Sequence, residues 1–201
     1  FKKSSIMVLE ALTRLRQASC HPGLVNPELR DISSGKVEVL KTMLQEIIDE
    51  GHKVVIFSQF TTLLKLVREK LNHDDKNSVY LDGSTHDREA VVNDFKSGEK
   101  SVFYLSIKAG GTGLNLTEAT YCFLLDPWWN PAVENQAIAR LHRLGQKKSV
   151  NVYRLITKSS VEEKVLELQK AKRELISDVL DENSEGFIRS LSKHDLEFLL
   201  N

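Results

Sequence analysis

The sequence has few cysteines and no long apolar run, and both absences narrow its class. Cys20 and Cys122 are too few for a disulfide framework, and no Cys/His spacing resembles a zinc site, so we expect no metal site. No apolar run approaches the roughly 20 residues that a membrane-spanning helix needs. The chain starts Phe1-Lys2-Lys3 without the apolar segment of a secretory signal, so we expect a cut within a longer chain and no membrane partner.

The sequence also lacks a net charge, because Lys plus Arg and Asp plus Glu both number 28. A neutral total argues against nucleic-acid binding, but the charges are unevenly distributed. Residues 135–161 contain no acid and six bases, namely Arg140, Arg143, Lys147, Lys148, Arg154 and Lys158. Such a patch can attract an anion despite the neutral total, and an ordinary solvated face is the alternative.

Short β-rich runs alternate with longer helical patterns through the middle of the chain. The strand candidates are often continuously apolar, as strands covered on both faces are. They are residues 53–57, 78–81, 102–106, 121–125 and 150–156. The helical patterns between them are residues 36–50, 60–71, 86–95 and 131–142. This alternation predicts an α/β fold, a parallel sheet with helices on both faces.

Several residues mark where these helices start and stop. Gly51 follows the first helical pattern and predicts its end. Ser84 or Thr85 is the predicted cap of the helix at 86–95. Asn130 is the predicted cap of the helix at 131–142, with Pro131 in its first turn.

Two flanks depart from the alternation. Residues 4–18 predict a leading helix, residues 160–180 a long amphipathic helix that packs back on the sheet, and residues 187–200 a last helix. We therefore divide the chain into a leading segment at 1–33, an α/β lobe at 34–158 and a helical brace at 159–201.

The phosphate cradle G-x-x-x-x-G-K-[ST] of a complete ATPase is missing. Ser34-Gly35-Lys36 holds a Gly-Lys pair, but Val37 follows, so it predicts a helix start. The acidic residues of 49–52 end a helix rather than a buried strand, so we expect them on the surface and not on a magnesium ion. The chain thus lacks half of a phosphoryl-transfer site.

The strongest positive signal is the segment Gln136-Ala-Ile-Ala-Arg140-Leu-His-Arg143-Leu-Gly145-Gln146. Arginines three residues apart share a face of a helix, where two guanidiniums can clamp phosphate oxygens. We expect Gly145 to end this helix and both arginines to face the carboxyl edge of the sheet, free of structural ion pairs. Arginines turned away from that edge would contradict the motor account, in which this chain is one lobe of an ATP-driven motor. Surface arginines on an amphipathic helix are the alternative.

Other candidate contacts follow predicted strands, where parallel sheets bind ligands. The loop at 106–116 offers Ser106, Lys108 and a glycine cluster that includes Gly111 and Gly113. A tight turn explains the glycines equally well.

A second group of contacts follows the other strands. Trp128 and Trp129 lie between prolines, where they could stack on a base or pack in the core. Ser58 follows the strand at 53–57, and Gly83 and Ser84 follow the strand at 78–81, where a helix start would suit phosphate. Each of these is equally a turn with a cap.

Taken in order, these segments resemble the carboxyl-terminal helicase lobe of the Swi/Snf-type chromatin-remodelling ATPase family, within helicase superfamily two. The resemblance covers about residues 34–172, and the ending His142-Arg143-Leu144-Gly145-Gln146 is its most specific part. Residues 53–60 are similar to motif IV, 81–85 to the following phosphate-contacting motif, 106–116 to motif V and 136–146 to motif VI. The segment Asp126-Pro-Trp-Trp-Asn-Pro131 looks most like bacterial and archaeal members.

The resemblance implies a RecA-like lobe that meets a missing N-terminal RecA-like lobe of the same polypeptide. ATP and Mg²⁺ would be held mainly by that missing lobe, and the two lobes would translocate along double-stranded DNA. Arg140 and Arg143 match the arginine fingers, and Gln136, Gly111 and Gly113 match positions near the nucleotide.

The resemblance places a second set of residues at DNA, namely Ser58, Gly83, Ser84, Ser106, Lys108 and Trp129. We expect a monomer, inactive as a fragment, that is nucleoid-associated in a prokaryote or nuclear in a eukaryote. A stand-alone DNA-binding module and a lobe of an RNA helicase are the alternatives.

Overall fold

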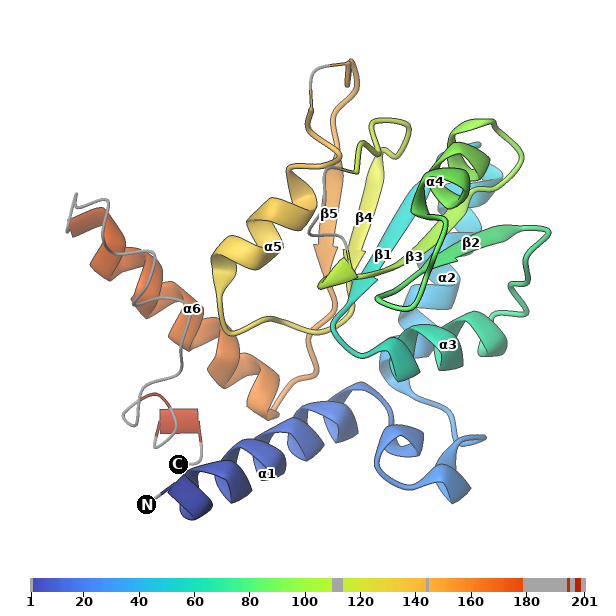
Figure 1. Cartoon of the computed structure of the whole chain (residues 1–201). Helices are drawn as coiled ribbons and strands as arrows, with labels where there is room; N and C mark the ends of the chain where they lie inside the picture. Colours follow the sequence, from blue (N-terminus) through green and yellow to red (C-terminus); the bar gives the residue numbers. More distant parts are fainter. Residues whose placement is uncertain (1, 110–113, 144, 179–194, 196–197, 200–201) are drawn as a thin grey trace.

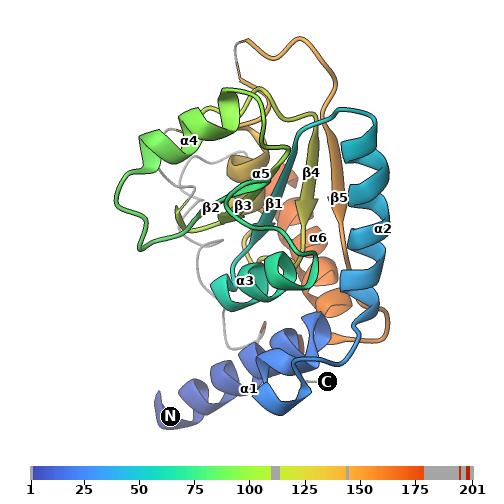
Figure 2. The ribbon, with the colours of Figure 1, turned by 90° about the vertical axis from the view of Figure 1, so that its right-hand side faces the viewer.

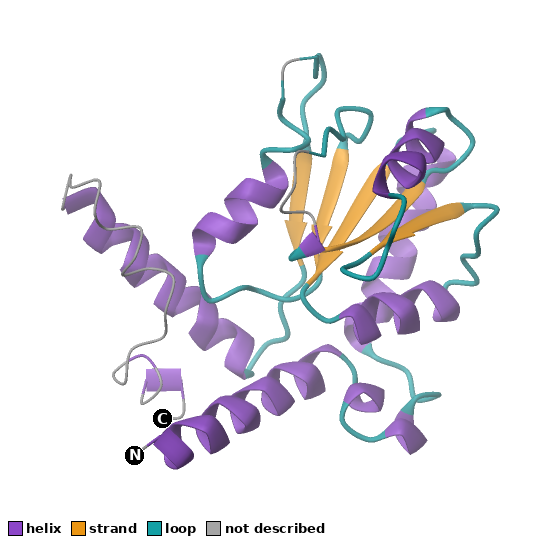
Figure 3. Ribbon diagram, in the orientation of Figure 1, coloured by secondary structure: helices purple, strands orange, loops and turns teal. Residues whose placement is uncertain are grey.

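The computed structural model describes residues 2–109, 114–143, 145–178, 195 and 198–199. Its centre is a five-stranded sheet in the order β2-β3-β1-β4-β5, in which every pair of neighbours is parallel (Figures 1 and 3). The strands are β1 (Val54–Ser58), β2 (Ser78–Leu81), β3 (Val102–Ser106), β4 (Tyr121–Leu124) and β5 (Asn151–Arg154). The predicted parallel α/β fold is confirmed.

Helices cover both faces of the sheet, as predicted. Helices α2 (Gly35–Asp49) and α3 (Thr61–Lys70) pack on one face, and α4 (Arg88–Lys96) and α5 (Pro131–Ile138) on the other. Figure 2 shows α2 and α4 on opposite sides of the strands. Alternate residues of one strand divide between the two cores, since Val54 and Ile56 face α2 and α3 whereas Val55 and Phe57 face α4 and α5.

The outermost strand β5 departs from the expectation of two covered faces. It pairs only with β4 within the described sheet, and Tyr153 is 37% exposed. Edge position alone does not cause this exposure, because β2 at the other edge of the sheet is mostly buried.

The ends of three helices test the predicted signals. Gly51 has a φ of +78° just after α2, and the Asn130 side chain accepts a hydrogen bond from the Ala132 N–H at 2.9 Å, so both signals are confirmed. The cap predicted for α4 at Ser84 or Thr85 is wrong. Asp87 caps α4 by accepting from the Ala90 N–H at 2.9 Å.

Helix α5 ends at Ile138, four residues before the predicted end. The Arg140 N–H bonds to the Ala137 carbonyl and the Leu141 N–H to the Ile138 carbonyl, so tighter i→i−3 turns replace the α-helix. Arg140 and Arg143 therefore lie in the turns after α5 rather than on one helix face, and Gly145, with a φ of +113°, lies seven residues beyond the helix.

Two long helices form a third layer beside the sheet. Helix α1 (Lys2–Cys20) packs against α6 (Val161–Asp178) through a small apolar cluster: Leu12, Val161, Val165, Leu168 and Leu199. Short 3₁₀ turns at Pro22–Leu24 and Pro27–Leu29 connect α1 to the sheet domain. The last predicted helix lies mostly outside the described residues. No described helix combines the length and apolarity needed to cross a bilayer.

Candidate nucleotide and DNA interface

Four strands end side by side at the carboxyl edge of the sheet, and the predicted DNA contacts follow them there. β1 leads to Ser58, β2 to Gly83, β3 to Ser106 and β4 to Asp126. The register pairs Ser58 with Ser106 across β1 and β3. The edge therefore gathers these segments although they are far apart in the sequence.

The two serines at this edge are buried. Ser58 has no exposed surface, and its hydroxyl donates to Asp126 Oδ1 and accepts from the Phe60 N–H at 2.9 Å. Ser106 is 3% exposed. Neither hydroxyl is at the surface where a DNA phosphate could meet it, which corrects the expectation for both side chains.

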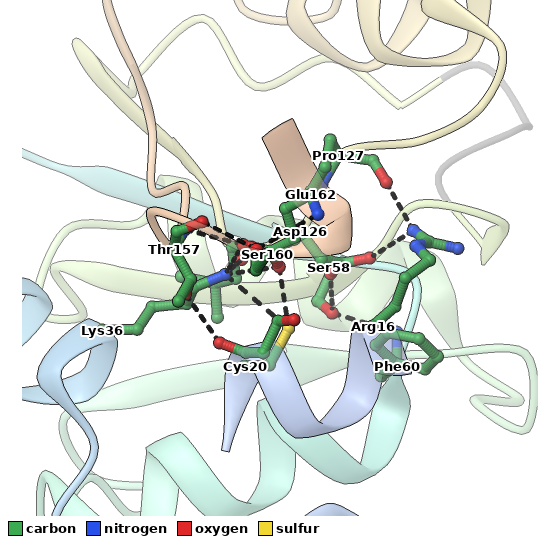
Figure 4. A network of polar contacts seen from close by, with 12 residues as sticks. Arg16, Cys20, Lys36, Ser58, Phe60, Asp126, Pro127, Thr157, Ser160 and Glu162 are labelled. Atoms are coloured by element: carbon green, nitrogen blue, oxygen red, sulfur yellow. Dashed lines mark hydrogen bonds and ion pairs between the residues drawn. The ribbon is translucent and has the colours of Figure 1, made fainter. Parts of the chain in front are cut away.

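Asp126 is the centre of a buried junction that the sequence did not reveal (Figure 4). Its carboxylate also accepts from the Gln59 N–H at 3.2 Å and lies 3.4 Å from an Arg16 nitrogen of α1. Arg16 is 1% exposed and donates to the Pro127 carbonyl. Burial raises the pKa of Asp126 to about 6, although Arg16 opposes that rise.

A second buried junction binds the start of α6 to α1 and α2 (Figure 4). Lys36 Nζ lies 2.6 and 2.7 Å from the two carboxylate oxygens of Glu162 and donates to the Leu125 carbonyl at 2.7 Å. Glu162 also accepts from Cys20 Sγ at 3.3 Å and from the Thr157 N–H at 2.9 Å. Every described contact of this carboxylate therefore serves to join elements of the fold.

The tryptophans after β4 are both half-buried. Trp129 packs on the α1–α6 cluster, and the Arg16 guanidinium lies 4.1 Å from the centre of its ring. These contacts favour the packing alternative for Trp129, and its contact with DNA stays a prediction. Trp128 lies nearer the predicted DNA side, with Lys108 Nζ 5.7 Å from its ring centre.

Three predicted DNA contacts are exposed at the carboxyl edge: Gly83, Ser84 and Lys108. After β2, Asp82 accepts from the Ser84 N–H at 2.8 Å and from the Ser84 hydroxyl at 2.6 Å. This turn is built by Asp82 rather than by a helix start, so the helix-terminus argument for phosphate does not apply to Gly83 and Ser84.

The Arg140 guanidinium is buried, and not all of its nitrogens have a hydrogen-bond acceptor among the described residues. Arg140 is 6% exposed, and its Nε donates to the Gln136 carbonyl at 3.1 Å. Its Nη1 is buried and has no hydrogen-bond partner within the described part of the chain. Burial lowers the pKa of Arg140, and the nearby positive charge of Arg143 lowers it further. A buried donor without an acceptor is costly, so this group is suited to an anion supplied from outside.

The arginine turn (residues 139–143) lies away from the carboxyl edge. Helix α5 starts after β4 and runs back against the strands, and the chain after it rises to the top of Figure 1 whereas the arrowheads point down. The Arg140 carbonyl accepts from the Leu116 N–H at 3.2 Å, so the turn adjoins the crossover (residues 114–120) that leads from β3 to β4. The expectation that both arginines face the carboxyl edge is wrong, because α5 is antiparallel to the strands. This geometry counts against the motor account, whose remaining support from these residues is the motif sequence and the buried Arg140 donor.

The other predicted nucleotide contacts are only partly described. Gly111 and Gly113 lie outside the described residues. Gln136 is exposed in the last turn of α5, and its carbonyl holds Arg140. The described residues hold no group of three or more His, Cys, Asp or Glu that could bind a metal ion.

The Gly-Lys pair starts a helix and the acids at 49–50 lie on the surface, as predicted. Ser34 precedes the first residue of α2, and Asp49 and Glu50 are exposed at its end. Sequence reasoning missed the buried acids Asp126, Glu134 and Glu162. Asp126 and Glu134 each follow an apolar residue outside any charged run, which is a signal for burial, whereas Glu162 lies in the charged run Glu162-Glu163-Lys164 and gives no such signal.

The lobe has a parallel sheet with polar residues at the carboxyl ends of its strands, and Arg140 has a buried nitrogen without a hydrogen-bond partner in the described chain. The sequence contains no phosphate cradle. These features are those of a RecA-like lobe of a helicase-type ATPase. A model of the helicase conserved C-terminal domain matches residues 35–145. The chain belongs to this family and is the carboxyl-terminal helicase lobe of a Swi/Snf-type ATPase.

Individual relatives agree with this placement. The chain is 39% identical to DNA repair protein RAD5A of Arabidopsis thaliana over 87% of this chain and 17% of the relative. It is 36% identical to the ISWI chromatin-remodeling complex ATPase ISW1 of Saccharomyces cerevisiae over 96% of this chain and 18% of the relative. Its fold matches the Sulfolobus solfataricus SWI2/SNF2 ATPase core domain with a TM-score of 0.71 and 32% identity, covering 96% of this chain and 40% of that one.

The chain spans about a fifth or less of the length of the curated relatives. The relatives include a plant, a yeast and an archaeal protein, so the bacterial or archaeal type stays a prediction. The boundaries at residues 33 and 158 also stay predictions.

Proposed function

We propose that the chain is the second motor lobe of a DNA-dependent ATPase that translocates along double-stranded DNA. The lobe closes over ATP and Mg²⁺ held mainly by the N-terminal RecA-like lobe of the same polypeptide. The observation that carries the proposal is the buried Arg140 Nη1, which has no partner in the described chain and has Arg143 nearby.

The chemistry follows from this charge arrangement. Two neighbouring guanidiniums repel each other, and a triphosphate between the lobes offers the oxygens that Arg140 lacks. An arginine that reaches a γ-phosphate in this way accelerates transfer by about 10³ to 10⁵. Gln136, in the last turn of α5, supports this arrangement because its carbonyl fixes the Arg140 Nε.

The DNA grip is proposed for the carboxyl edge. Gly83, Ser84 and Lys108 are exposed there and can meet phosphates, which position a protein on DNA without reading its sequence. Ser58 and Ser106 support this edge from inside. Opening and closing of the two lobes would then move this grip along the DNA.

Several broader attributes belong to the same proposal. We propose a monomer with no membrane partner, nucleoid-associated in a prokaryote or nuclear in a eukaryote. The names of RAD5A and ISW1 refer to DNA repair and chromatin remodelling, which makes a protein–DNA complex a reasonable object of the motor.

The test is the replacement Arg143→Ala in the protein that carries both lobes. We expect duplex-DNA-stimulated ATP turnover to fall by about 10³ while duplex-DNA affinity changes less than threefold. Lys158→Ala is the matched control, because Lys158 is exposed and follows β5, outside the arginine turn. Unchanged turnover in Arg143→Ala would refute the role, and stronger stimulation by RNA than by duplex DNA would favour an RNA helicase lobe.

A further inference from the structure

Glu134 is a buried carboxylate on α5 that lies between the two proposed interfaces. It is 1% exposed and accepts three hydrogen bonds. The donors are the Trp128 N–H at 2.8 Å, Gln169 Nε2 of α6 at 2.8 Å and Arg154 Nε of β5 at 3.1 Å. Glu134 therefore joins the loop after β4, the edge strand and the brace helix to α5.

The DNA side of this connection begins at Lys108. Its ammonium lies 5.7 Å from the Trp128 ring centre, at the exposed carboxyl edge. The backbone of Trp128 is held from two directions, because its N–H donates to Glu134 and its carbonyl accepts from Gln169. A shift of Trp128 must therefore strain or move the Glu134 carboxylate.

The nucleotide side of the connection is α5 itself. Gln136 follows Glu134 by two residues, and its carbonyl accepts from Arg140 Nε at 3.1 Å. A helix of eight residues transmits a displacement of Glu134 as a nearly rigid body. Hydrogen bonds and the helix backbone thus connect Trp128 through Glu134 and α5 to Arg140.

Among the described residues, Arg154 is the cation that forms an ion pair with Glu134, and the charge of Arg16 also acts on it from farther away. Arg154 pairs with it, and the Arg154 side chain is 35% exposed whereas that of Glu134 is 1% exposed. Hydrogen bonds to a charged acceptor are about twice as strong as neutral ones, so the ionised form of Glu134 makes the stiffest link. Replacing the carboxylate by an amide keeps the shape but weakens the link and presents an N–H₂ to donors.

We propose that Glu134 is a positioning residue that couples DNA contact at Lys108 and Trp128 to the placement of Arg140. This inference rests on the proposed motor function. It predicts that Glu134 sets how strongly DNA stimulates ATP hydrolysis, rather than how tightly DNA binds or how fast ATP is hydrolysed without DNA.

The experiment measures ATP turnover of the two-lobe protein with and without saturating duplex DNA, together with duplex-DNA affinity. In Glu134→Gln we expect the stimulation ratio to fall about tenfold, in the range of measured coupling effects. The DNA-free rate and the DNA affinity should change less than twofold. A preserved ratio, or an equal fall of both rates, would overturn the proposal. Glu163→Gln, an exposed acid of α6, is the matched control.

A second pair of variants keeps the test decisive if Glu134→Gln fails to fold. Arg154→Gln removes the counter-cation from a partly exposed position and should lower the ratio about threefold, and Arg154→Lys should restore it. Equal ratios in Arg154→Gln and the wild type would also overturn the proposal. If Arg143→Ala abolishes turnover while Glu134→Gln keeps full stimulation, the relay is wrong and the motor function stands. If Arg143→Ala leaves turnover intact, the motor function itself fails.

Discussion

Two regions of the molecule bury positively charged side chains, and they differ in whether a carboxylate lies beside each charge. At the junction of α1, α2 and α6, Arg16 and Lys36 lie against Asp126 and Glu162. In the arginine turn, Arg140 is nearly as buried but pairs with no carboxylate among the described residues. One nitrogen of each arginine, Arg16 Nε and Arg140 Nη1, is buried without a hydrogen-bond partner in the described chain, so the carboxylate is what distinguishes the two. Paired charges in the first region hold elements together, whereas the second region keeps a donor available for an anion from elsewhere.

The two regions also differ in how they are connected. The junction lies at the carboxyl edge, where β1 and β4 end, and each of its carboxylates has several donors. The arginine turn lies at the far end of α5, and one backbone hydrogen bond, from the Leu116 N–H to the Arg140 carbonyl, joins it to the crossover. Several hydrogen bonds therefore hold the lobe to α1 and α6, whereas at the proposed nucleotide site the Arg140 Nη1 lacks a hydrogen-bond acceptor in the described chain.

The largest effect on stability is expected from breaking the junction at Glu162. In Glu162→Ala, Lys36 is left buried without its carboxylate, so the free energy of unfolding should fall by about 3–5 kcal/mol. Urea denaturation measures this loss. Glu167→Ala, an exposed acid of the same helix, should change it by about 0.5 kcal/mol or less. A loss below about 1 kcal/mol in Glu162→Ala would show that the junction does not hold α6.

An intermediate effect is expected in the pH dependence of stability. Burial raises the pKa of Asp126 to about 6, above its unfolded value of about 3.9. The native state therefore binds this proton more tightly, and the carboxyl's contribution is full below about pH 4 and is lost as the pH rises through 6.

The matched variant for this prediction is Asp126→Asn, which cannot titrate. The stability of the wild type relative to Asp126→Asn should fall by about 2 kcal/mol between pH 4 and 6.5, measured by urea denaturation at each pH. If the relative stability instead rises with pH, the ion pair with Arg16 outweighs burial and the charge in this junction is ionised throughout.

The smallest effect is expected for Arg140→Met, which sharpens the comparison. Because Arg140 pairs with no described carboxylate, removing its charge leaves no buried acid unpaired and should keep the free energy of unfolding within about 1 kcal/mol of the wild type. Arg16→Met should lose more than 2 kcal/mol, since it leaves Asp126 buried without its cation. Thermal or urea unfolding of both variants measures the contrast, and equal losses would show that the two regions do not differ.

The framework of the fold could be predicted from the sequence, because it depends on local periodicity. All five strands and the four helices between them agree with the predicted ranges to within a few residues. The errors lie where tertiary contacts override local signals. Ser84 hydrogen-bonds to Asp82 within the turn after β2, so Asp87 caps α4 instead. Helix α5 changes to i→i−3 turns before it reaches Arg140.

The candidate site could be predicted only in part. Motif spacing selected Arg140, Arg143 and Lys108, whose roles stay predictions, whereas the burial of the other candidates depends on tertiary contacts. Ser58 hydrogen-bonds to Asp126, and the Trp129 ring packs against the Arg16 guanidinium. In each pair the two residues are far apart in the sequence. No periodicity reveals that Glu134 joins α5 to Arg154 and Gln169, because those contacts exist only in the folded chain.

The central claim is that Arg140 and Arg143 act on ATP bound by another lobe. Its most direct test is the single-turnover rate of ATP hydrolysis by the two-lobe protein carrying Arg140→Ala and Arg143→Ala, at saturating ATP and duplex DNA. The account predicts a rate lower by about 10³ with the protein still folded and ATP still bound. A rate within threefold of the wild type would contradict it.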